Sequence, residues 1–383
     1  MMTVHWCGTG LSSGPGLRRL LDAGHDIRLW HIDESAARAL VAPRSALLRD
    51  FSEEALAAEL RPGDIVVSML PPEMHLPLAR IALRGRAHFA CSSYITEGLR
   101  ALDTPAREAG VALVAEVGLD PGIDHLMAHD LVADYRASGK VAPGNTISFR
   151  SCCGGVPAVP NAFRYKFSWS PLGVLRALRA PSRSIRHFSE LSVSHPWDAI
   201  LRYDAPLPQP ETFEVYPNRD SLPYRAEYRF DPEWRIEDFM RGTIRLLGWA
   251  DAWQPVFAAL EDGGPDAETR LAALAERLWH DNAYAPDEAD RVVLVVDLAV
   301  KRDGATVWHK AWALDAKGDA RGSAMARLVS GTLSHAVEAI LAHEIPAGLH
   351  SAPHDPKLVH RWLGALESQA QYLAKRDLTR AHP

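Results

Sequence analysis

The sequence predicts an α/β protein, and two observations carry that prediction. Short apolar runs suited to buried strands alternate with amphipathic helical patterns over the first third of the chain, an order typical of a doubly wound parallel sheet. Glycines crowd the turn after the first apolar run. At 383 residues the chain is also too long for one small core, so we expect at least two domains.

The first domain is expected to consist of regular strand–helix pairs. Each expected strand is a short apolar run, and each expected helix has apolar residues at helical spacing. The strands are TVHWC (3–7), DIRLWHID (26–33), DIVVSML (64–70), AHFACSSY (87–94) and VALVAEV (111–117). The first two helices are LRRLLDAGH (17–25) and ESAARALVA (34–42).

The turn GTGLSSGPG has the spacing GxGxxxGxG and indicates a dinucleotide-binding Rossmann domain. Gly8 and Gly10 would make the tight turn and admit a pyrophosphate, and Gly14 or Gly16 would let the helix pack close to the strand. A glycine-rich turn in some other α/β protein is the alternative. Ligands of such sheets bind beyond the carboxyl ends of strands. The expected cofactor-binding residues are Gly8, Gly10, Leu11, Ser12, Ser13, His31, Ile32, Asp33, Met69 and Leu70.

The end of the second strand bears on the choice of cofactor. Asp33 lies 19 residues after Gly14, near the position where an acid binds the ribose 2′-OH of NAD. An NADP site prefers a cation there, and His31 is the nearby candidate. A solvated loop after the strand is the alternative for both residues.

The stretch AEVGLDPGIDHLMA (115–128) places an acid on a tight turn beyond a strand end. Asp120 suits the N-cap of the next helix, Pro121 its first position, and Asp124 its positive end. His125 is a tempting base, but one histidine in a helix is more often structural. The helix face is expected to comprise Ile123, Leu126, Met127, Leu131 and Val132.

Composition excludes several classes of protein. The net charge of −6 provides no broad basic field for nucleic acid. No apolar run approaches the roughly 20 residues that span a bilayer. We expect no leader peptide, because MMTVHWCG leads straight into the first apolar strand. The four cysteines, Cys7, Cys91, Cys152 and Cys153, have no CxxC spacing and fit a reducing, cytoplasmic setting. The 17 histidines show no metal-ligand spacing, so we expect no metal site.

Six blocks of sequence resemble the glutamate-forming saccharopine dehydrogenases, also called saccharopine reductases, and they occur in that family's order. The resemblance covers nearly the whole chain. The blocks are EVGLDPGIDHLMA (116–128), SCCGGVPA (151–158), YKFSWSPLGVLRALR (165–179), YPNRDSLPY (216–224), RGTIRLLGW (241–249) and GSAMARLVSG (322–331).

The resemblance implies a fold, a chemistry and an assembly. It implies a Rossmann domain over 1–121, a substrate-binding and dimerisation α/β domain with a mixed sheet over 122–346, and a segment at 347–383 that packs back on the first domain. A reduced helical insert would lie at about 247–286. The implied reaction is the reversible condensation of glutamate with α-aminoadipate semialdehyde and NADP-dependent reduction to saccharopine, in lysine metabolism. A cytoplasmic homodimer is expected.

The resemblance also implies roles for individual residues. A substrate with several carboxylates needs fixed cations, and Arg219 and Arg245 are the expected clamps, with internal salt bridges as the alternative. Imine chemistry needs proton transfers. The implied catalytic residues are Asp120, Tyr94 and Cys153, and the alternative for Cys153 is simple packing. The implied substrate-binding residues are Ser92, Ser93, Leu119, Phe167, Ser168, Arg219, Thr243, Ile244 and Arg245.

Two departures from the family pattern leave alternatives open. LWHIDESA (29–36) lacks the arginine that NADP-using relatives have there, so NAD remains possible. The loop after Gly155 is shorter than in the family, so the substrate could be another amino-acid or polyamine imine. A substrate with fewer carboxylates would leave one arginine dispensable. From another class, a non-catalytic dinucleotide-binding sensor or scaffold would bind cofactor without turnover.

Overall fold

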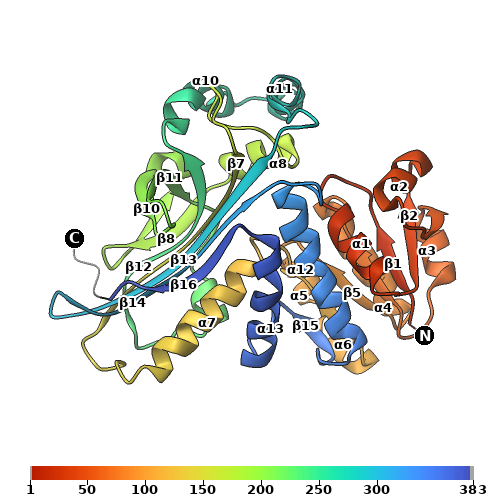
Figure 1. The fold of residues 1–383 in the computed structure, drawn as a ribbon, viewed down its shortest axis with the longest axis horizontal. Helices are drawn as coiled ribbons and strands as arrows, with labels where there is room; N and C mark the ends of the chain where they lie inside the picture. Colours follow the sequence, from red (N-terminus) through yellow and green to blue (C-terminus); the bar gives the residue numbers. More distant parts are fainter. Residues whose placement is uncertain (1, 380–383) are drawn as a thin grey trace. The chain divides into compact units, whose positions relative to one another are not determined.

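The structure, a computed structural model, describes residues 2–379 and divides into two compact units (Figure 1). The first unit runs to Leu126 and also includes Ala320–Trp362, whereas the second comprises Met127–Asp319 and the segment from Leu363 onward. These limits differ from the expected boundaries after residues 121 and 346, because the chain returns to the first unit at Ala320, before its last long helix.

The first unit contains, within the described residues, a seven-stranded sheet in the order β15-β6-β5-β4-β1-β2-β3. Every pairing in it is parallel. The strands are β1 (Val4–Cys7), β2 (Ile27–His31), β3 (Leu47–Asp50), β4 (Ile65–Ser68), β5 (His88–Cys91), β6 (Ala112–Val114) and β15 (Gly348–His350). The expected doubly wound parallel sheet is therefore confirmed.

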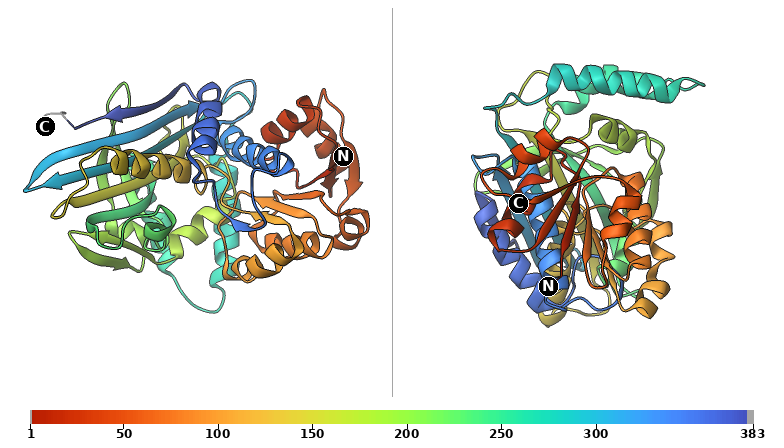
Figure 2. Two further views of the ribbon diagram at one scale, coloured as in Figure 1. Left: turned by 90° about the horizontal axis from the view of Figure 1, so that it is seen from below. Right: turned by 90° about the vertical axis from the view of Figure 1, so that its right-hand side faces the viewer.

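Helices cover both faces of this sheet (Figure 2). α1 and α12 pack together on one face, and α4 packs against β4 and β5. Buried aliphatic and aromatic side chains of β1, β4, β5 and α4 form the core between these layers. The helices are α1 (Gly14–Asp22), α2 (Glu34–Val41), α3 (Glu53–Glu59), η1 (Pro72–Met74), α4 (His75–Arg84), α5 (Glu97–Arg100), α6 (Asp103–Ala109) and α12 (Ala324–Leu341).

Gly16 is explained by a contact between helices rather than by the expected approach of helix to strand. A Cβ atom at Gly16 would lie 2.0 Å from the carbonyl oxygen of Ser330 in α12. The Gly16 N–H also donates to the Ser330 hydroxyl at 2.9 Å. The glycine thus allows α1, which follows the glycine-rich turn, to pack closely on a helix more than 300 residues away in the sequence.

The helix after the glycine–aspartate turn begins later than expected. α7 (Ile123–Ala137) starts two residues after Pro121, and the Asp120–Pro121 peptide is cis. The turn closes on itself: the Gly118 N–H donates to the Pro121 carbonyl at 2.9 Å. Asp120 is therefore not the N-cap, and Asp124 supplies a side-chain oxygen to the Gly122 N–H at 2.7 Å instead.

The second unit is built on a mixed sheet in the order β10-β11-β12-β7-β13-β14-β16, with β8 and β9 attached beside β12. Only the β12–β7 pair is parallel among the described pairings of this sheet, which confirms the expected mixed sheet. The strands are β7 (Thr146–Pro157), β8 (Ser182–Arg186), β9 (Ser189–Val193), β10 (Leu201–Ala205), β11 (Glu211–Pro217), β12 (Arg235–Leu246), β13 (Asp290–Arg302), β14 (Ala305–Lys317) and β16 (Tyr372–Asp377).

Helices also pack on this sheet. α7 lies along β14 and β16 (Figure 2), where Asp134 pairs with Lys310 at 3.0 Å and with Lys375 at 2.8 Å. An aromatic core joins α8, α10 and α11 to the sheet. The remaining helices are α8 (Pro171–Arg179), η2 (Pro196–Ala199), α9 (Tyr224–Glu227), α10 (Trp249–Glu261), α11 (Ala267–Asn282), α13 (Pro356–Leu366) and η3 (Glu367–Gln369).

Candidate active site

The turn after β1 packs closely on the chain that follows β4 at Gly8 and is open at Gly10. Gly8 has φ +115, and a Cβ atom there would lie 2.9 Å from the Met69 carbonyl group after β4. Gly10, by contrast, has nothing within 4 Å of its would-be Cβ. α1 begins at Gly14, so the turn leads directly to a helix N-terminus, where Pro15 has no N–H and the Gly16 N–H is already bound to Ser330.

Two of the residues expected to bind cofactor differ in orientation. The Ser13 hydroxyl donates to the Gly8 carbonyl at 2.8 Å and accepts from the Trp6 indole at 3.1 Å, so it braces the turn from inside. Leu11 is 62% exposed at the crest of the turn. Leu11 is thus presented to the surroundings, whereas Ser13 is fully buried.

The end of β2 opens into a cavity of about 330 Å³ lined by His31, Glu34, Arg38, Ala46, Leu47, Leu48 and Asp50. The buried His31 Nδ1 atom has no hydrogen-bond partner among the described residues. Ile32 is 90% exposed, and the Asp33 carboxylate caps α2 by accepting the Ala36 N–H at 3.1 Å. The cavity therefore offers one imidazole and one guanidinium, together with exposed carboxylates.

Beyond β5, Ser92, Ser93 and Tyr94 form a half-buried segment. The Ser93 hydroxyl lies 2.8 Å from Nε2 of His75, and Nδ1 of the same ring lies 2.8 Å from the Ser68 hydroxyl at the end of β4. Burial lowers the pKa of His75 to about 4. The ring is therefore neutral at pH 7, and its two nitrogens connect the end of β4 to the segment after β5.

Asp120 is half-buried on the turn before α7, and Leu119 beside it is buried. The chain leading into this turn passes through Glu116, whose buried carboxylate lies 3.0 Å from the His125 ring. Asp120, Ser92, Ser93 and Tyr94 thus all follow the carboxyl ends of adjacent strands, as expected for a ligand site in such a sheet.

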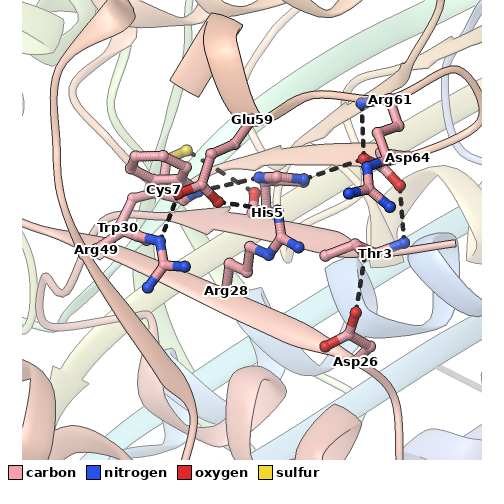
Figure 3. A network of polar contacts seen from close by, with 10 residues as sticks. All are labelled: Thr3, His5, Cys7, Asp26, Arg28, Trp30, Arg49, Glu59, Arg61 and Asp64. Carbon is pink, nitrogen blue, oxygen red and sulfur yellow. Dashed lines mark hydrogen bonds and ion pairs between the residues drawn. The ribbon is translucent and has the colours of Figure 1, made fainter. Parts of the chain in front are cut away.

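The opposite edge of the same sheet holds a polar network of a different kind (Figure 3). The Trp30 indole donates to Nδ1 of His5 at 3.2 Å, so Nε2 of His5 carries the proton toward Asp64, also at 3.2 Å. Asp64 further accepts the N–H groups of Thr3 and Arg61, each at 2.9 Å. This network ties the beginnings of strands together and leaves the carboxyl ends for a ligand.

In the second unit, β12 separates the expected substrate residues onto two faces. Thr243 pairs in register with Cys153 of β7 and with Tyr216 of β11, so these three side chains share a face with Arg245. Ile244 points to the other face and packs in the apolar core there. Ile244 and Arg245 were both expected to bind substrate, but only Arg245 lies on the same face of the sheet as Cys153.

Arg245 is a buried cation surrounded by aromatic rings. Its guanidinium carbon lies 4.8 Å from the Tyr165 ring, 5.4 Å from Trp249 and 5.5 Å from Tyr216. It is 5% exposed, and its Nε atom has no hydrogen-bond partner among the described residues. Glu214, its register partner on β11, is engaged by the N–H groups of Gly248 and Ala250 at the start of α10.

Three further buried polar atoms of the second unit have no hydrogen-bond partner within the described part of the chain: Ser168 Oγ, Trp249 Nε1 and Tyr284 OH. Trp249 contacts Arg245 directly. The segments that carry Ser168 and Tyr284 run side by side, because Phe167 bridges to Ala283. Buried donors without acceptors cost free energy, so the neighbouring Arg245 guanidinium and Trp249 indole suit a ligand with acceptor oxygens.

The remaining expected residues fall in different surroundings. Arg219 is exposed and has φ +58, and its carbonyl accepts the Arg183 N–H at 2.8 Å. Phe167 is buried against Tyr165 and Trp253 and contributes to the core. Within residues 2–379, no three His, Cys, Asp or Glu side chains gather as a metal site, and no helix there has the length and apolarity to cross a bilayer.

Several residues of these clusters were not found from the sequence. Trp249 and Tyr284 have the character of ordinary core aromatics, and only their unpartnered polar atoms distinguish them. His75 gives no local signal, because its partners lie at two other strand ends. Glu116 belongs to an expected strand, yet it has φ +57 and leaves the sheet.

Comparisons with known proteins agree with the earlier resemblance. Residues 4–114 match the family model described as saccharopine dehydrogenase NADP binding domain. Residues 118–371 match the model described as saccharopine dehydrogenase C-terminal domain. The two matches together cover both units of the chain.

Curated relatives are similar over part of their length. Saccharopine dehydrogenase (NADP(+), L-glutamate-forming) of Pyricularia oryzae is 34% identical over 254 residues, which cover 64% of this chain and 55% of the relative. The Saccharomyces cerevisiae protein of the same name is 36% identical over 230 residues, covering 56% and 48%. The matched part spans about half the length of these relatives.

A solved structure extends the similarity over the whole fold. Apo saccharopine dehydrogenase (L-Glu forming) from Saccharomyces cerevisiae has a TM-score of 0.82 and 25% sequence identity, covering 98% of this chain and 100% of that chain. A homospermidine synthase from Legionella pneumophila, at 9% identity and a TM-score of 0.62, shares the fold alone, over 99% of this chain and 92% of that chain.

Proposed function

The chain belongs to the saccharopine dehydrogenase family, and from that premise we propose that it is an NADP-dependent oxidoreductase acting on saccharopine. In the oxidative direction, the C–H bond beside the secondary amine loses hydride to NADP⁺, and the resulting imine adds water. The products are glutamate, α-aminoadipate semialdehyde, NADPH and a proton. The reverse direction condenses the two products and reduces the imine.

The first unit supplies the features that a dinucleotide needs. Gly10 leaves open space beside the turn, and the turn leads into the N-terminus of α1, whose positive dipole end favours phosphates. At the end of β2, the His31 ring and the Arg38 guanidinium, which pairs with Glu34, line the cavity proposed to take a 2′-phosphate. Arg38 compensates for the arginine absent from residues 29–36, and the Asp33 carboxylate is occupied as a helix cap. When bound, NADP accepts and returns hydride.

The observation that carries the proposal is the state of Arg245. A guanidinium buried among three aromatic rings, with its Nε–H unpartnered in the described structure, is suited to a carboxylate ligand. The Trp249 indole beside it adds a second N–H group that is unpartnered among the described residues. Saccharopine carries several carboxylates on a secondary amine, and this donor set is the chemistry that would bind one of them.

Asp120 and Tyr94 are the proposed proton-transfer groups. Both are half-buried and follow the carboxyl ends of strands, where a ligand of this sheet would lie. An acid–base group there would remove the amine proton as hydride leaves and would assist water addition to the imine. Cys153 shares a strand face with Thr243 and Arg245, and at 7% exposure it is proposed to line the substrate site.

The proposal is tested by the products. Purified protein is incubated with saccharopine and NADP⁺, and the mixture is analysed by mass spectrometry for glutamate and the semialdehyde. Formation of both in a 1:1 ratio with NADPH is expected. The control is a secondary amine of the same length without carboxylates, which should remain unreacted. Oxidation of that control amine in preference to saccharopine would refute the assignment.

Assembly and location extend the proposal. We propose a cytoplasmic homodimer, as the family resemblance implies. The burial of Cys7, Cys91, Cys152 and Cys153 as thiols is compatible with a reducing compartment. Light scattering coupled to gel filtration measures the mass in solution, and a monomer at micromolar concentration would contradict the dimer.

A further inference from the structure

The buried carboxylate of Glu116 connects two segments that carry proposed proton-transfer groups. Glu116 follows β6 and is 4% exposed. One of its oxygens faces the segment that contains Tyr94, and the other faces the helix that follows the Asp120 turn. All of these residues belong to the first unit.

Glu116 brackets Tyr94 on both sides. Its backbone N–H donates to the Ser93 carbonyl at 2.9 Å, and its Oε1 accepts the Ile95 N–H at 2.9 Å. The residues immediately before and after Tyr94 are therefore both bound to one residue. Neither contact comes from the regular pairing of the sheet, because β5 ends at Cys91.

The second oxygen of Glu116 begins a chain of contacts toward Asp120. Oε2 lies 3.0 Å from Nε2 of His125, and Nδ1 of the same ring lies 3.4 Å from a carboxylate oxygen of Asp124. The other oxygen of Asp124 accepts the Gly122 N–H at 2.7 Å. Each nitrogen of the His125 ring thus faces a carboxylate, and the ring links Glu116 to Asp124.

The backbone conformation of Glu116 indicates that surrounding contacts hold this residue in place. Its φ of +57 lies in the left-handed region, which glycine, asparagine and aspartate enter far more readily than glutamate. Residues held there persist only where surrounding contacts determine them, and such residues gather at functional sites. The turn that follows is equally constrained, because a Cβ atom at Gly122 would lie 2.2 Å from the Gly118 carbonyl oxygen.

We propose that Glu116 is a positioning residue that holds the Tyr94 segment and the Asp120 turn in one fixed arrangement, with His125 and Asp124 as the link to the turn. The inference rests on the proposed function in one respect, namely that Tyr94 and Asp120 act on the substrate. The coupling between the two segments is a property of the fold and is measurable without any substrate.

A matched control is available at the other edge of the same sheet. Glu59 is also a carboxylate with two partners, Arg28 and Arg49, but it lies in the network at the beginnings of the strands (Figure 3). Glu59→Gln removes the same charge from the same unit without touching the Tyr94 segment or the Asp120 turn.

The experiment combines hydrogen–deuterium exchange with steady-state kinetics. In Glu116→Gln, amides of residues 92–96 and 118–124 should both exchange several-fold faster than in the wild type, and Glu59→Gln should leave both segments unchanged. With saccharopine, kcat of Glu116→Gln should fall by about 10²-fold, the cost of a small misplacement, while the KM for cofactor stays within twofold. Unchanged exchange at 118–124, or a wild-type kcat, would overturn the proposal.

A second variant keeps the test decisive if Glu116→Gln fails to fold. His125→Gln cuts only the second part of the chain, so exchange should rise at 118–124 and stay unchanged at 92–96. Faster exchange at 92–96 alone would overturn the proposed order of contacts. If wild-type protein does not oxidise saccharopine, the proposed function fails, whereas the exchange data still decide the coupling.

Discussion

The two units treat a buried charge in opposite ways. In the network at the beginnings of the first sheet's strands, the Asp64 carboxylate accepts from His5, Thr3 and Arg61 (Figure 3). In the second unit, Arg245 is equally buried, but its Nε–H has no acceptor among the described residues and rings surround it. A charge satisfied within its own chain stabilises the fold. A buried donor without an acceptor weakens the fold and is available to a ligand.

The largest expected effect comes from Arg245→Met, which keeps an unbranched, apolar side-chain stem and removes the charge. Loss of two charge-assisted hydrogen bonds to a carboxylate, about 3–4 kcal/mol, should lower kcat/KM for saccharopine roughly 10²–10³-fold. The free energy of unfolding should stay the same or rise, because no ion pair is broken. Steady-state kinetics measures kcat/KM, and urea unfolding measures the stability. A variant that loses stability but keeps a normal kcat/KM would show that Arg245 stabilises the fold and does not bind the substrate.

Asp64→Ala should show the opposite pattern. It leaves the Thr3 and Arg61 N–H groups and the His5 ring without their acceptor, which should cost about 3 kcal/mol of stability. The kcat/KM for saccharopine should stay within twofold of the wild type, because Asp64 lies at the far edge of the sheet from the proposed site. Urea denaturation measures the stability of the variant, and initial rates measure its kcat/KM. A variant that is stable but inactive would contradict the structural role given to Asp64.

Gly10, in the turn after β1, and Gly16, in the helix that follows it, allow the same comparison within the first unit. Gly16→Ala places a Cβ 2.0 Å from the Ser330 carbonyl oxygen, so it should destabilise the protein by about 2 kcal/mol. Gly10→Ala meets nothing within 4 Å, so stability should be unchanged while the cofactor KM rises about tenfold from steric contact with the ligand. Thermal melts and cofactor titrations separate the two, and an unchanged cofactor KM in Gly10→Ala would remove the turn from the cofactor site.

His75 should give a pH dependence of stability that is absent at neutral pH and appears only in acid. Burial lowers the pKa of His75 to about 4 from its usual 6.5, so the unfolded chain binds a proton that the folded chain refuses. Stability should therefore fall as the pH falls from 6.5 toward 4, by roughly 2 kcal/mol at pH 5 from this group. His75→Gln should reduce that slope in urea titrations at pH 7.5 and 5, and an identical slope in both proteins would assign the effect elsewhere.

Much of the first unit follows from local sequence patterns, because its strands are buried apolar runs between helical patterns. β3 was not expected, since it is an edge strand of leucine, arginine and aspartate with no fully buried position. β15 was not expected either, because Gly348–His350 pairs with a strand more than 230 residues earlier. A short strand that pairs only with a distant part of the chain has no local periodicity from which it could be predicted.

The candidate site was predicted unevenly for physical reasons. Arg245 entered through the resemblance, because a strand arginine by itself more often forms an internal salt bridge. Asp120 was expected at an N-cap, but the side chain of Asp124 binds the free N–H before α7. The links from Glu116 to His125 and Ile95 depend on a left-handed backbone position, which no residue-type pattern indicates for glutamate.

The most direct test of the account is saccharopine-dependent reduction of NADP⁺, followed by nicotinamide absorbance, with wild-type protein and Arg245→Met side by side. The account predicts saturable reduction by the wild type, and a large loss in the variant although it remains folded and binds cofactor. Equal rates in the two proteins would show that the buried arginine does not hold the substrate. No reduction by a wild type that binds NADP⁺ would show that the chain does not act on saccharopine.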